Sequence, residues 1–74
     1  MKCPVCEQDA QDCTPNDFEA GGVVLRCRDC GDYDVAGGYF EQLLELPIHD
    51  RKQALAKAKR FTKGGRPSIN SICF

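Results

Sequence analysis

The stretch CPVCEQDAQDCTPNDFEAGGVVLRCRDC, residues 3–30, decides how this chain of 74 residues folds. It begins and ends with a C-x-x-C pair, and twenty residues separate the two pairs. Each C-x-x-C turn directs two sulfur atoms at one point, and a hairpin between the turns brings the two points together. Four thiolates then form the tetrahedral shell that zinc accepts. The spacing therefore predicts that Cys3, Cys6, Cys27 and Cys30 bind one metal ion.

Other uses of these four thiols are open at the level of sequence. Two disulfides would need an oxidising compartment, and the N-terminal residues MKCPVC lack the apolar segment of a secretion signal. A redox dithiol would need a thioredoxin-like βαβ pattern, which the sequence does not show. Iron is the chemical alternative to zinc, because a tetrahedral sulfur site suits both metals. We expect a cytoplasmic protein with one structural Zn²⁺ per chain.

The small size of the chain also favours a metal. A core built from so few residues stabilises a fold only marginally against the entropy of the unfolded chain. An ion that binds the folded form supplies the missing stabilisation, so metal binding and folding become one equilibrium.

The rest of the sequence predicts an α+β fold in a single domain. Short strands are expected at 10–14, 23–27 and 32–35, and the third ends at the glycines that follow it. Apolar spacing predicts a helix at 38–46, which Pro47 ends or kinks. A second helix extends to residue 63, with Asp50 as N-cap, Gly64 as C-cap and an inward face of Ala54, Leu55, Ala58 and Phe61. We thus expect a metal-binding ribbon at 1–36, a helical hairpin at 38–63 and an extended tail at 64–74.

Residues 1–36 resemble a zinc ribbon. The knuckle CPVC, a β-hairpin, the second knuckle CRDCG and the strand DYDV follow one another as in that family. The longer run CRDCGDYDVAG, with the two helices and the GGRPSI segment, is similar to small bacterial and phage zinc-ribbon proteins. The resemblance implies a structural metal and a surface that binds nucleic acid or protein. The sequence departs from the ribbon pattern at Glu7, where a ribbon often has the glycine that Gly31 supplies in the second knuckle.

Three further residues of types that can bind a metal lie outside this pattern: Cys13, Cys73 and His49. Cys13 is expected in a strand, packed as a small hydrophobe. Cys73 is expected to be an unreactive thiol near a frayed chain end. The alternatives are a replacement ligand at Cys13, or a disulfide between these two cysteines. His49 is expected to be a solvated or capping residue at the start of the second helix, because four thiolates already complete a zinc shell.

Charge is divided sharply along the chain. All eleven acidic residues lie in 1–50 beside three basic ones, a net charge of −8, whereas residues 51–74 carry seven basic residues and no acidic one. The acidic residues around the second knuckle, Asp29, Asp32 and Asp34, are expected to form a solvated acidic surface. On the second helix, a basic stripe faces away from the apolar side and comprises Lys52, Lys57, Lys59, Arg60 and Lys63.

Three interpretations of the basic stripe compete. It is a solvated helix face that offsets the acidic ribbon, a nucleic-acid surface, or a docking surface for a protein partner or a second copy. The position of Phe61 on the apolar face argues against nucleic acid, since it leaves little aromatic surface for stacking bases. We expect a protein partner and a regulatory or inhibitory role, with DNA or RNA binding through residues 51–63 as the alternative.

Catalysis is not expected. A catalytic zinc keeps one coordination position open, whereas four cysteines close the shell. We therefore expect no enzyme activity and no small-molecule substrate. No run of apolar residues is long enough to span a membrane, so no membrane partner is expected.

Overall fold

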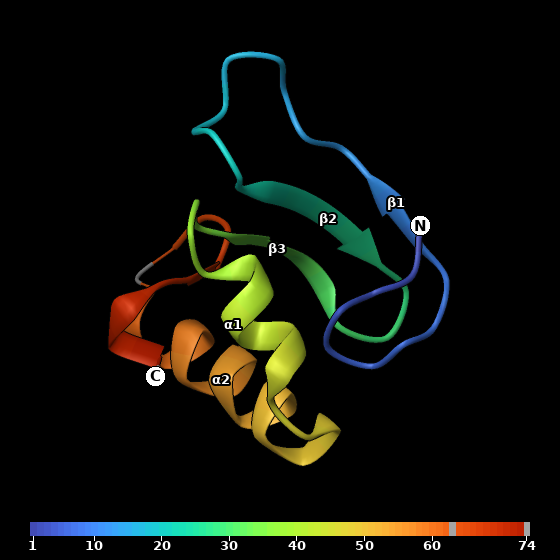
Figure 1. Cartoon of the computed structure of the whole chain (residues 1–74), viewed down its shortest axis with the longest axis vertical. Helices are drawn as coiled ribbons and strands as arrows, with labels where there is room; N and C mark the ends of the chain where they lie inside the picture. Colours follow the sequence, from blue (N-terminus) through green and yellow to red (C-terminus); the bar gives the residue numbers. More distant parts are fainter. Residues whose placement is uncertain (63, 74) are drawn as a thin grey trace.

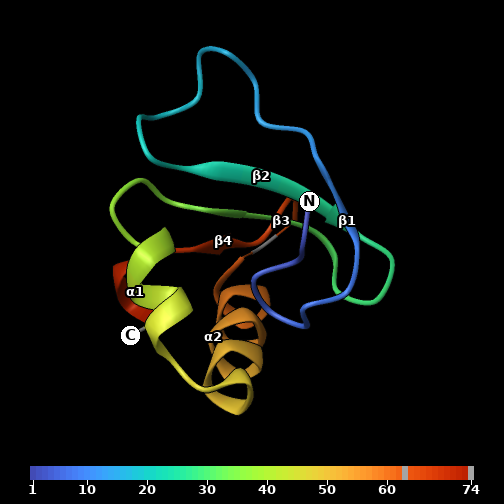
Figure 2. The ribbon, with the colours of Figure 1, turned by 45° about the vertical axis from the view of Figure 1, so that its right-hand side comes forward.

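The computed structural model describes residues 1–62 and 64–73, and its architecture is α+β as the sequence predicts. One sheet has the order β1-β2-β3-β4. Its first three strands, β1 (Ala10–Asp12), β2 (Val23–Cys27) and β3 (Gly31–Val35), are antiparallel. Two helices, α1 (Phe40–Glu45) and α2 (Ile48–Phe61), then precede β4 (Ser68–Ile69) and a short 3₁₀ turn, η1 (Ser71–Cys73). Figures 1 and 2 show α1 and α2 together on one side of the sheet.

The β2–β3 hairpin is the centre of the fold. Its register pairs Leu25 with Tyr33 and Cys27 with Gly31. Leu25, Tyr33 and Val35 are fully buried, and they meet Leu43 of α1 in one core. The hairpin therefore presents apolar side chains to the helices and also carries the second C-x-x-C turn at its tip.

Strand β1 is shorter than the predicted strand at 10–14. The Asp12 carboxylate accepts hydrogen bonds from the Thr14 backbone N–H (3.0 Å) and hydroxyl (2.6 Å). This local turn ends the regular pairing after Asp12. The connection at residues 13–22 then swings away from the helices before β2 begins (Figure 1).

Helix boundaries differ from those predicted. Helix α2 begins at Ile48 with Pro47 as N-cap, so Asp50 lies in its first turn and does not cap it. Proline fits this position because the first helical turn leaves its N–H groups unbonded, and Asp50 there favours the helix dipole. The predicted C-cap Gly64 is also wrong. The cap is Thr62, whose N–H (3.0 Å) and hydroxyl (2.8 Å) both donate to the Ala58 carbonyl.

The predicted inward face of α2 is confirmed for Ala54, Leu55 and Ala58, which are buried, and is wrong for Phe61. Phe61 is 59% exposed because it is the last residue of the helix, and the C-terminal segment packs on α2 instead. Ile69 and Cys73 join the same core as Ala58. Helical periodicity places Phe61 at the angle of the apolar side of the helix. It cannot show that β4 and η1, later in the chain, pack on α2.

The C-terminal segment adds an edge strand and pairs the buried Asp34 with the partly exposed Arg66. Strand β4 runs parallel to β3, and the Asp34 N–H donates to the Pro67 carbonyl (2.9 Å). The Asp34 carboxylate, 7% exposed, accepts from Arg66 Nε (2.8 Å) and from the Ser68 hydroxyl (2.5 Å). The expected solvated position of Asp34 is therefore wrong, because β4 covers this carboxylate and pairs it. Asp29 and Asp32 are exposed as expected.

Candidate metal centre

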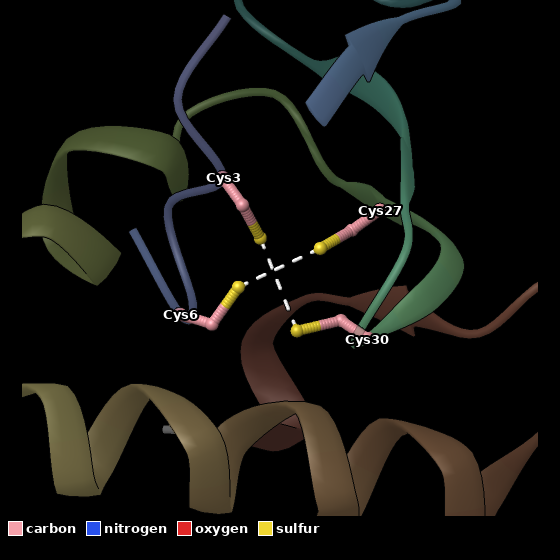
Figure 3. A group of neighbouring side chains, drawn as sticks. All are labelled: Cys3, Cys6, Cys27 and Cys30. Carbon is pink, nitrogen blue, oxygen red and sulfur yellow. Dashed lines mark hydrogen bonds between the residues drawn. The ribbon is translucent and has the colours of Figure 1, made fainter. Parts of the chain in front are cut away.

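Four cysteine side chains converge at the end of the sheet next to α2. Cys3 and Cys6 precede β1, Cys27 ends β2, and Cys30 lies in the turn before β3. Their sulfur atoms all lie within 4.8 Å of one another, and Figure 3 shows them directed at one point. Two of the six sulfur–sulfur distances are 3.9 Å (Cys3–Cys30) and 3.5 Å (Cys6–Cys27). A tetrahedral shell with metal–sulfur bonds of about 2.3 Å requires sulfur separations of about 3.8 Å, so the four thiols fit a zinc-sized ion.

Backbone hydrogen bonds shape the first knuckle. The Cys3 N–H donates to the Gln8 carbonyl (2.7 Å), and the Glu7 N–H donates to the Cys3 carbonyl (2.8 Å). Glu7 adopts φ of 63°, the left-handed conformation that Gly31 adopts after the second knuckle with φ of 81°. The missing glycine therefore leaves the shape of the knuckle intact and places about 1–2 kcal/mol of backbone strain on Glu7.

The four thiols differ in burial, and those of Cys3, Cys6 and Cys30 have shifted pKa values. Burial raises the pKa of Cys3, but hydrogen bonds from the Tyr33 hydroxyl (2.9 Å) and from the Cys6 and Val5 backbone outweigh it and lower the pKa to about 7. Burial raises the pKa of Cys6, with Cys27 and Cys3 adding to the rise. Burial also raises the pKa of Cys30, and the neighbouring thiols raise it further. The Cys3 thiolate thus forms readily, and its negative charge disfavours ionisation of Cys6 and Cys30. A bound cation removes this electrostatic repulsion.

Tyr33 is a functional residue that the sequence analysis missed. It is fully buried on β3, and its hydroxyl contacts Cys3 Sγ. Burial raises the pKa of this phenol, with the hydrogen bond to Cys3 as the second cause, so it remains a protonated donor to the Cys3 thiolate. A hydrogen bond from a buried donor fixes the orientation of a metal ligand. The sequence pattern places Tyr33 only within the strand expected at 32–35.

Cys13, Cys73 and His49 lie outside the cluster. All six cysteines are free thiols. Cys13 is exposed beyond the end of β1, so its predicted packing as a small hydrophobe is wrong. Cys73 is buried in the core and 4% exposed, which contradicts a frayed position. His49 is exposed as expected, and its Nε2 lies 3.0 Å from Gln53 Nε2.

Arg51 connects the first knuckle to the helices. Its guanidinium donates to the Leu46 carbonyl (2.8 Å), to the Leu44 carbonyl and to the Pro4 carbonyl (3.3 Å). The first two acceptors lie at the C-terminal end of α1, where carbonyls have no partner within the helix. No local sequence pattern indicates these contacts of Arg51.

The basic stripe is only partly described. Lys52, Lys57, Lys59 and Arg60 are exposed on α2, whereas Lys63 lies outside the described residues. Within residues 1–62 and 64–73, none of these four cations forms an ion pair with the acidic ribbon.

Comparisons with known proteins add no relative to this geometry. No family model, curated protein or solved structure matches the chain. In the part of the chain that the structure describes, no helix is long and apolar enough to cross a membrane.

Proposed function

We propose that this chain is a zinc-stabilised binding module, in which Cys3, Cys6, Cys27 and Cys30 hold one structural Zn²⁺. The convergence of their four sulfur atoms on one point carries the proposal. The ion would connect the N-terminal segment to the β2–β3 hairpin and stabilise both. A shell of four thiolates leaves no open coordination position, so the proposed metal has no catalytic role.

The metal assignment is tested by elemental analysis and by cobalt substitution. The protein expressed with zinc should contain one Zn²⁺ per chain and should unfold when a strong chelator removes it. Co²⁺ should give the intense visible bands of a tetrahedral thiolate site, and iron in the purified protein would favour the alternative metal. A Cys3→Ser variant that retains stoichiometric zinc with unchanged affinity would contradict the assignment, whereas Cys13→Ser should change nothing.

We further propose that the module acts by docking on a partner protein, in a regulatory or inhibitory role. Support comes from the four exposed cations of α2, Lys52, Lys57, Lys59 and Arg60, which have no acidic partner among the described residues. In residues 1–62 and 64–73, any offset of the acidic ribbon by these cations is long-range and leaves them without a contacting carboxylate. The charges are therefore available to an acidic surface of another molecule.

The partner is tested by affinity capture from nuclease-treated lysate. A specific partner protein should be retained by the wild type and lost when Lys59 and Arg60 are both replaced by glutamate. Retention of the same protein by the charge-reversed variant would show that the basic face does not dock it. Replacement of Lys2 and Arg28 by glutamate provides a control for net charge, because it changes the same number of cations away from α2.

One observation favours nucleic acid as a second candidate. Phe61 is 59% exposed at the end of α2, directly after Arg60 and four residues after Lys57. An exposed aromatic beside cations is what stacking on a nucleic-acid base requires, so the argument from the expected burial of Phe61 no longer holds. Binding to labelled single-stranded DNA or RNA that weakens steeply with salt and is lost in Phe61→Ala would support this candidate. No binding at about 50 mM salt would exclude it.

A further inference from the structure

Two hollows lie on either side of one small residue on the outer face of α2. The larger, about 420 Å³, is an open groove between α2 and both knuckles, with Lys52 and Lys59 at its edge. The smaller, about 260 Å³, is lined by Gln53, Ala56, Lys57 and Arg60. Ala56 also lines the groove, so the two hollows share this residue. We call this surface the Ala56 saddle.

We propose, resting on the proposed docking function, that the Ala56 saddle binds a short acidic protein segment that carries one apolar side chain. The occupant is defined by the lining of the groove and by the charges at the edge of both hollows.

The floor of the groove is apolar and lies against the metal centre. Val5 and Leu55 line it at 1% and 4% exposure, beside the half-buried Cys6 and Cys30. Figure 3 shows α2 passing next to the latter two residues. With zinc bound, four thiolates leave about two negative charges at this floor. A carboxylate is therefore unfavourable there, and an uncharged aliphatic side chain is the group that fits.

The edges of the saddle carry the complementary charge. Lys52, Lys59 and the exposed Asp29 line the groove, and Lys57 and Arg60 line the smaller hollow, so the saddle holds four cations and one carboxylate. Seven residues of helix separate the first two, a rise of about 10 Å, which an extended segment covers in about three residues. In an extended segment, two carboxylates four residues apart and an apolar side chain midway between them share one face, and their span of about 13 Å is within reach of the two long lysine side chains.

A protein segment fits this surface better than nucleic acid does. A phosphate chain would use the four cations but would place its charge beside the anionic metal centre and leave the apolar floor uncovered. An acidic peptide uses the cations and the floor together. The small side chain of Ala56 permits the close approach that such contacts need.

The test selects ligands from a library of random peptides of about 12 residues, long enough to cover both hollows. The zinc-loaded full chain is the target. Enriched sequences should contain Asp or Glu flanking an aliphatic residue. Ala56→Arg should weaken their binding about tenfold or more, because its side chain fills the saddle. Ala56→Ser should retain binding, and both exposed substitutions should keep the zinc content and circular dichroism of the wild type.

The Ala56→Arg variant also separates the two classes of ligand. It adds a cation, so it should bind a thymidine strand of about 20 nucleotides at least as tightly as the wild type does. If the selected peptides bind the Ala56→Arg variant and the double variant Lys52→Gln/Lys59→Gln as tightly as they bind the wild type, the Ala56 saddle is refuted as the binding site. That result would leave the proposed partner protein unaffected. Failure to enrich any peptide would overturn the saddle as a peptide site, whereas the proposed partner protein is decided separately by affinity capture. Salt-sensitive binding of the thymidine strand without peptide enrichment would assign the face to nucleic acid.

Discussion

Replacement of Arg51 by methionine isolates the contribution of one side chain that joins three parts of the molecule. The substitution retains an unbranched apolar stem and removes the guanidinium. Three hydrogen bonds are lost, to the carbonyls of Leu44, Leu46 and Pro4. We expect the zinc-loaded protein to remain folded but to unfold more easily.

The expected magnitude follows from the geometry of these contacts. Each hydrogen bond contributes about 0.5–1.5 kcal/mol net, and the positive charge at the C-terminal end of α1 adds about 0.3–1 kcal/mol. Together these contributions amount to about 2–5.5 kcal/mol. The 3.3 Å contact to Pro4 and the partial exposure of Arg51 place the expected loss in the lower half of this range. We expect the free energy of unfolding to fall by about 2 kcal/mol.

Urea denaturation at a fixed concentration of free zinc measures this change. With an m value of about 1 kcal/mol/M, the midpoint should decrease by about 2 M. Arg60→Met, on the exposed face of the same helix, is the matched control and should change stability by about 0.5 kcal/mol or less. Arg51→Lys should recover less than half of the loss, since one ammonium cannot reach three carbonyls. An Arg51→Met variant as stable as the Arg60→Met control would refute the reasoning.

Three other substitutions test separate features. Tyr33→Phe removes the hydroxyl that donates to Cys3, so zinc affinity in chelator competition should fall about tenfold to a hundredfold. Loss of the Tyr33 hydroxyl should also raise the pKa of Cys3 above its value of about 7. Acid should therefore release zinc at a higher pH than in the wild type. An unchanged pH midpoint of zinc release would argue against this hydrogen bond. Glu7→Gly relieves the backbone strain at φ of 63° but adds conformational freedom to the unfolded chain. The net effect in denaturation should be a stabilisation of up to about 1 kcal/mol, and a loss of stability would contradict the strain. Asp34→Asn weakens the pairing with the partly exposed Arg66 and should destabilise the protein by about 1–2 kcal/mol after allowance for solvent screening, and faster hydrogen exchange at Ile69 should accompany it.

The sequence alone was sufficient for the features that depend on spacing. The two C-x-x-C pairs predicted the four-thiol cluster, and the apolar run 23–27 predicted β2 at its observed bounds. Helical periodicity predicted the buried side of α2 at Ala54, Leu55 and Ala58. The strand and helix predictions depend on repeats of two or 3.6 residues. The cluster is predictable because each C-x-x-C turn has a fixed local geometry, although twenty residues separate the two turns.

Tertiary structure decided the features that depend on residues distant in the sequence. Asp34 is buried because β4 returns to pair beside it, and Phe61 is exposed because the same segment occupies the core next to α2. Tyr33 reaches Cys3, and Arg51 reaches Pro4, across thirty and forty-seven residues of chain. No local pattern encodes these contacts, because they form only when the sheet and the helices pack together. The sequence thus determined which residues gather at the candidate metal centre, and packing determined which side chains support it and which remain exposed.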